Sequence, residues 1–133
     1  MALDPDRDYP LGSRRADLVT TPGGIPLREL DLYAPEVTTG ELRATPETLR
    51  LQAAVAVAAG RPELAGNLLR AAELAPLPDE TVLEIYAALR PRRSSSAELE
   101  AWADRLEGWG APLVARFVRE AGEVYARRGL LAA

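Results

Sequence analysis

Apolar residues recur every three or four positions along most of the chain after residue 44, the spacing that places side chains on one face of an α-helix. Prolines and glycines interrupt this pattern at regular intervals and divide it into segments. We therefore predict five helices, over residues 45–60, 62–75, 78–90, 95–107 and 112–128. The predicted fold class is all-α, a compact bundle of about five helices.

Local signals mark the ends of these helices. Thr45 is a predicted N-cap with Pro46 at the first helical position, and Gly60 is a predicted stop. Ser95 and Glu98 have the spacing of a capping box. The apolar stripes expected to face inward include Val82, Ile85, Tyr86 and Leu89 in the third helix, and Leu99, Trp102, Ala103 and Leu106 in the fourth.

The first 44 residues differ from the rest because they contain five prolines and the pair Gly23-Gly24. Proline fixes φ and removes a backbone donor, so this segment cannot hold a long helix. We predict an extended, proline-rich arm over residues 1–44 and a helical bundle over residues 45–133. Within the arm, a short strand-like piece is expected over residues 25–33, and a helical turn over residues 39–43.

Two features suggest contact with another protein. The arm carries apolar residues without helical packing of their own, so it either wraps its own bundle or lies on a partner, and we expect the partner. Three arginines gather between the third and fourth helices, either as a solvated turn at a helix C-terminus or as an interface. The predicted partner-interface residues are Tyr9, Leu11, Leu27, Leu30, Tyr33, Arg90, Arg92 and Arg93.

Composition removes most kinds of chemistry from this chain of 133 residues. It has no cysteine and no histidine, and every cation is an arginine. Thiolate and imidazole metal ligands, histidine acid–base catalysis and lysine Schiff bases are therefore excluded. Glu47, Asp79, Glu80 and Glu98 fall in first helical turns, where a structural role is expected. We predict no catalytic, cofactor-binding or metal-binding residue.

The net charge of −4 argues against nucleic acid or an anionic membrane as the main partner. The N-terminus lacks the basic and apolar regions of a signal peptide, and the longest apolar run is too short to span a bilayer. We expect a cytoplasmic protein.

Seven collinear pieces closely resemble the small (gamma) subunit of adenosylcobalamin-dependent diol and glycerol dehydratases. They are DYPL at 8–11, TPETLRLQA at 45–53, AGR at 59–61, RAAEL at 70–74, PDETVLEIYAALRP at 78–91, RSS at 93–95 and ARFVREAGEVYARR at 115–128. Residues 12–36 match the family pattern poorly. The resemblance covers most of the chain, although no single piece is a catalytic motif.

The resemblance implies that the chain is a non-catalytic piece of a larger enzyme. In this family a large subunit binds the substrate, the small subunit is an accessory piece that grips the large one, and adenosylcobalamin lies between the large and medium subunits. The holoenzyme resembles a dimer of such heterotrimers, and its reaction is radical dehydration of 1,2-propanediol, glycerol or ethanediol to an aldehyde. Many relatives begin with a longer extension associated with bacterial microcompartments. Because this chain starts close to DYPL, targeting through that extension is not expected.

Two other interpretations stay open from the residues alone. One is a free-standing helical adaptor or regulator that binds a partner, or that binds nucleic acid through the arginines at 90–93. The other is an enzyme that uses carboxylates alone.

Overall fold

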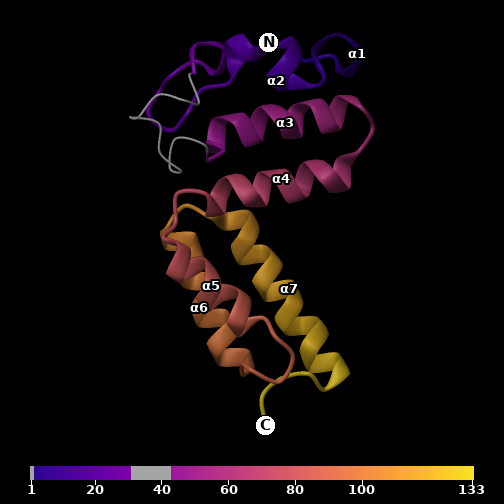
Figure 1. Cartoon of the computed structure of the whole chain (residues 1–133). Coiled ribbons are helices and arrows are strands. Elements are labelled where there is room, and N and C mark those ends of the chain that lie inside the picture. Colours follow the sequence, from indigo (N-terminus) through magenta and orange to yellow (C-terminus); the bar gives the residue numbers. More distant parts are fainter. Residues whose placement is uncertain (1, 31–42) are drawn as a thin grey trace. The chain divides into compact units, whose positions relative to one another are not determined.

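The computed structural model describes residues 2–30 and 43–133, which form two compact units, residues 1–75 and residues 76–133 (Figure 1). Across these described ranges the regular elements are helical, and strand-like pairing is limited to one isolated bridge between Thr20 and Pro26. The all-α prediction is confirmed, and so are the five long helices. The division into an arm over 1–44 and a bundle over 45–133 stays a prediction.

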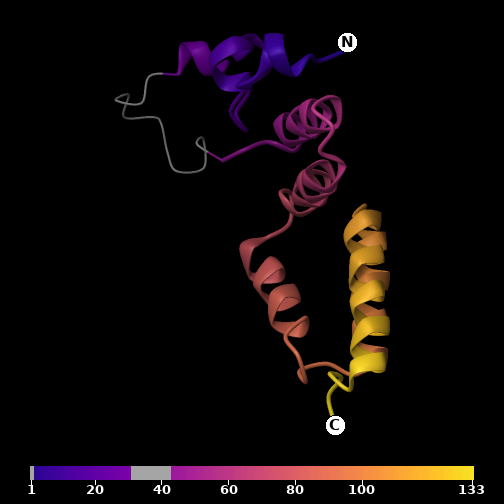
Figure 2. The same ribbon diagram turned by 90° about the vertical axis from the view of Figure 1, so that its right-hand side faces the viewer.

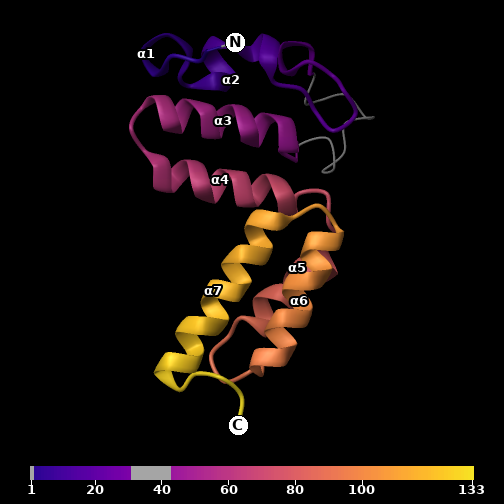
Figure 3. The same cartoon turned by 180° about the vertical axis from the view of Figure 1, so that it is seen from behind.

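The first unit combines short N-terminal helical turns with a hairpin of two long helices. Its elements are α1 (Pro5–Asp8), α2 (Leu11–Arg14), the 3-10 turns η1 (Ala16–Leu18) and η2 (Leu27–Glu29), α3 (Pro46–Ala58) and α4 (Pro62–Leu74). Figures 1 and 3 show α3 and α4 running side by side.

Local capping explains the hairpin. The Thr45 hydroxyl accepts a hydrogen bond from the Thr48 N–H at 3.1 Å, and Pro46 occupies the first turn of α3. Gly60 follows α3 with φ of 74°, a left-handed conformation that favours glycine, and Pro62 then opens α4. Three buried alanines, Ala53, Ala56 and Ala65, form the contact between the two helices. Their small side chains allow the helices to approach closely.

The N-terminal segment packs on α3. Leu3 and Leu11 are buried with Val55, and further apolar residues cover this cluster. The described part of the arm therefore packs on a helix of its own chain, and its expected contact with a partner stays a prediction. Of the strand-like piece predicted over residues 25–33, Pro26 forms an isolated bridge with Thr20, but the prediction is wrong over Leu27–Glu29, which form the 3-10 turn η2. The turn predicted over residues 39–43 lies almost entirely outside the described residues.

The second unit contains α5 (Asp79–Ala88), α6 (Ser96–Gly108) and α7 (Pro112–Arg128). The Ser95 hydroxyl accepts a hydrogen bond from the Glu98 N–H at 3.1 Å, as the capping-box spacing predicts. Helices α6 and α7 pack against each other, with α7 in front of α6 in Figure 2, and they carry the largest of the fully buried side chains of this unit. These fully buried side chains are Leu99, Leu106 and Val118.

Helix α5 departs from its predicted packing. Ile85 is buried, and Val82 and Leu89 are half-buried, as expected. Tyr86, which we predicted to face inward, is 62% exposed, and its neighbour Leu83 is 64% exposed. Apolar residues occupy more than one side of α5, and its unit covers only the side that carries Ile85.

Candidate partner-binding surfaces

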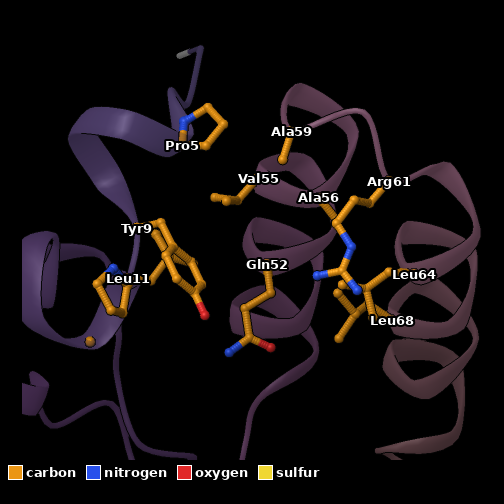
Figure 4. Close-up of a pocket in the computed structure, with 12 residues that line it drawn as sticks. Pro5, Tyr9, Leu11, Gln52, Val55, Ala56, Ala59, Arg61, Leu64 and Leu68 are labelled. Carbon is orange, nitrogen blue, oxygen red and sulfur yellow. The ribbon is translucent and has the colours of Figure 1, made fainter.

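An apolar pocket lies in the first unit between the N-terminal segment and the α3–α4 hairpin (Figure 4). Its volume is about 550 Å³. It is lined by Pro5, Tyr9, Pro10, Leu11, Gly12, Gln52, Val55, Ala56, Ala59, Arg61, Leu64 and Leu68. The lining is mostly apolar, with the polar groups of Tyr9, Gln52 and Arg61 among it.

Buried Asp8 holds the N-terminal wall of this pocket in place. Its carboxylate is fully buried and accepts hydrogen bonds from the Arg7 guanidinium, at 2.6 and 2.9 Å, and from the Asp4 N–H at 2.8 Å. Arg15, the residue that follows α2, donates a longer bond of 3.3 Å. The bonds from Arg7, with the Asp4 N–H next in effect, hold the pKa of the Asp8 carboxyl well below its ordinary value. Asp8 therefore stays ionised, and ties α1 to the segment that carries Tyr9 and Leu11.

The polar groups of the pocket favour recognition over chemistry. Tyr9 is 64% exposed, and Gln52 and Arg61 are exposed as well. Figure 4 shows the side chains of Gln52 and Arg61 extending past the apolar residues of the two long helices. A phenol, an amide and a guanidinium supply hydrogen bonds and one positive charge.

The second candidate surface is the loop after α5, with three arginines. Arg90, Arg92 and Arg93 are all exposed, and their side chains form no ion pair with a carboxylate of the described residues. The loop backbone is well anchored. The Arg92 N–H donates to the Leu130 carbonyl at 2.7 Å, and the Ser94 hydroxyl donates to the Ala88 carbonyl at 2.8 Å. The loop thus displays three cations on an ordered backbone.

Other charged and aromatic groups serve the fold. Arg119 on α7 donates to three carboxylates of α6, Glu100, Asp104 and Glu107, at 2.6–2.8 Å. These bonds, with those from Glu107 and Glu100 foremost, raise the pKa of Arg119. Arg105 lies over the rings of both tryptophans, 4.1 Å from the Trp102 centroid and 5.0 Å from that of Trp109. The tryptophans therefore pack against their own helix.

The structure brings together only some of the predicted interface residues. Tyr9 and Leu11 both line the pocket, but Leu11 is 5% exposed and mainly stabilises the first unit. Leu27 and Leu30 are half-buried around η2, and Tyr33 lies outside the described residues. Their predicted contact with a partner, like that of the three arginines, stays a prediction.

Four residues of these surfaces were missed by sequence reasoning. Gln52 and Arg61 line the pocket only because the N-terminal segment folds back beside α3. Leu83 and Tyr86 are exposed, and their helical spacing alone does not distinguish a core face from a surface face. The exposed position of two large apolar residues on adjacent turns is the signal that identifies them.

Two further observations concern metal ions and membranes. In the described ranges, no group of three or more acidic side chains is placed to hold a metal ion. None of the helices in the described ranges is both long and apolar enough to cross a membrane.

Comparison with known proteins places the chain in a family. The family model described as dehydratase small subunit matches residues 5–132. The propanediol dehydratase small subunit of Salmonella typhimurium is 48% identical over 125 residues, which cover 91% of this chain and 72% of the relative. The protein of the same description from Citrobacter freundii is also 48% identical over 125 residues, covering 91% and 73%. A match of this extent and identity shows that the chain belongs to the dehydratase small subunit family.

Proposed function

We propose that the chain is the non-catalytic small subunit of a diol dehydratase that converts a 1,2-diol, such as propanediol, to an aldehyde. The observation that carries this proposal is the 48% identity to two propanediol dehydratase small subunits over 91% of the chain. The paired helices and their caps make the chain a folded scaffold. This scaffold offers apolar and cationic surfaces to larger subunits.

The chemistry of the reaction takes place on other subunits. In this proposal adenosylcobalamin supplies the radical chemistry of 1,2-diol dehydration and lies between the large and medium subunits. The small subunit contributes surfaces that stabilise the large subunit, including the pocket beside Tyr9 and the loop with Arg90, Arg92 and Arg93. The whole enzyme is a dimer of heterotrimers. The charge of −4 and the apolar pocket support a protein partner over nucleic acid.

Co-expression with large and medium subunits of a propanediol dehydratase tests this function. We expect the tagged small subunit to co-purify with both, and the complex to form propionaldehyde from 1,2-propanediol after adenosylcobalamin is added. The purified small subunit alone should bind neither cobalamin nor diol in a calorimetric titration. Failure to co-purify with either larger subunit, or micromolar binding of cobalamin to the isolated chain, would refute the proposal.

A further inference from the structure

One face of α5 is apolar and exposed. Leu83 and Tyr86 are 64% and 62% exposed, and Ala87 beside them is exposed as well. Leu83, Tyr86 and Ala87, spaced by three and four residues, lie on the same side of the helix. Arg90 lies just after α5, whose last residue is Ala88. Large apolar side chains that are exposed on consecutive turns are unusual for a surface and indicate a contact.

This face is not needed to hold α5 in its own unit. Ile85, on another side of the helix, is the buried residue of α5. The Tyr125 hydroxyl of α7 donates a hydrogen bond of 2.5 Å to the Leu89 carbonyl and so attaches the end of α5. Figure 2 shows α5 running apart from α7, and Leu83 and Tyr86 of α5 are exposed. Leu83 and Tyr86 thus stay available.

Charge is distributed unevenly along the same helix. The acidic residues Asp79 and Glu80 lie in its first turn, whereas Arg90, Arg92 and Arg93 collect at and after its last turn. The backbone bond between Arg92 and Leu130 holds the loop although Arg92 has a φ of 65°, a conformation that non-glycine residues rarely adopt. The three guanidinium groups are therefore presented on an ordered loop.

We propose that Leu83, Tyr86 and Ala87, together with Arg90, Arg92 and Arg93, form a docking surface for a larger dehydratase subunit. The complementary surface presents apolar side chains beside carboxylates, because planar guanidinium groups pair best with carboxylates when apolar contact excludes water. This inference rests on the proposed function and names the surface through which the small subunit binds a larger subunit. A nucleic acid would satisfy the arginines but would leave Leu83 and Tyr86 against a charged backbone.

The test measures the affinity of the small subunit for its co-purified larger subunits in two sets of variants. The first set is Leu83→Ser with Tyr86→Ser, and the second is Arg90→Glu with Arg92→Glu and Arg93→Glu. Val57→Ser is the matched apolar control, since Val57 is 61% exposed on α3, and Arg116→Glu is the charge control on the exposed side of α7. We expect each set to weaken binding at least tenfold, about 1.4 kcal/mol, and each control to change it less than twofold.

Ionic strength separates the two contributions. Raising salt from about 0.1 to 1 M shortens the Debye length from roughly 10 to 3 Å. The loss of affinity caused by the arginine substitutions should therefore be smaller at high salt. The loss of affinity caused by the serine substitutions should be the same at both salt concentrations. A benzophenone amino acid at position 86 gives an independent measurement that does not depend on a destabilising change, and we expect it to cross-link to a larger subunit.

The outcomes distinguish this inference from the proposed function. If the unaltered chain binds no dehydratase subunit, the proposed function fails. If the unaltered chain binds and both sets of variants bind equally well, the α5 surface is refuted. Cross-linking of position 86 to residues 2–75 of the same chain, or to a second copy in a dimer detected by sedimentation, also overturns it, because α5 then has another occupant.

Discussion

Replacing Gly122 by alanine should stabilise the second unit, although Gly122 is buried in the middle of α7. A Cβ atom added there would lie 3.6 Å from Cδ1 and 3.8 Å from Cβ of Leu99 on α6, which is ordinary van der Waals contact. Alanine is about 0.8–1.0 kcal/mol more favourable than glycine in a helix interior. Because the new methyl group meets no clash, we expect the free energy of unfolding to rise by about 1 kcal/mol.

The two tryptophans provide a selective assay. Trp102 and the cap residue Trp109 both belong to α6, so urea unfolding followed by their fluorescence reports on the second unit. Gly129→Ala is the matched control at the C-terminal end of α7, the helix that carries Gly122. Gly129 has a φ of 68° and no neighbour within 4 Å of an added Cβ, so this change should destabilise by about 1–2 kcal/mol through the backbone alone. A lower unfolding free energy for Gly122→Ala would show that α6 and α7 approach more closely than described, and would refute the reasoning.

Two further predictions concern the interior of each unit. Leu106 is fully buried on α6, so Leu106→Ala should lower the free energy of unfolding by about 2–5 kcal/mol in the same fluorescence assay, and a loss below about 1 kcal/mol would contradict its central place in the core. The pKa of the Asp8 carboxyl is lowered in the folded state, so the ionised carboxylate stabilises the fold at neutral pH. This stabilisation is lost as pH falls below the ordinary pKa of 3.8 and through the folded pKa. Asp8→Asn should accordingly lower the melting temperature more at pH 7 than near about pH 2, as measured by circular dichroism. An equal effect at both pH values would show that the ionised carboxylate has no role.

Helix boundaries were predictable because capping depends on residues close together in the chain. Thr45 with Thr48, and Ser95 with Glu98, form the expected cap hydrogen bonds at 3.1 Å. Gly60 adopts the left-handed conformation expected at a helix end. The all-α class and the family resemblance follow from the same local patterns, which extend over most of the chain.

Exposure and contact were decided by the tertiary structure. Tyr86 fits the apolar period of α5 as well as Ile85 does, yet one is 62% exposed and the other is 4% exposed. Asp8 stands in an acidic, proline-rich stretch that suggests a solvated carboxylate, but Arg7 and Arg15 surround it and it is fully buried. Periodicity determines which residues share a helix face. Which face is covered depends on residues distant in the chain, and those contacts form only when the helices pack.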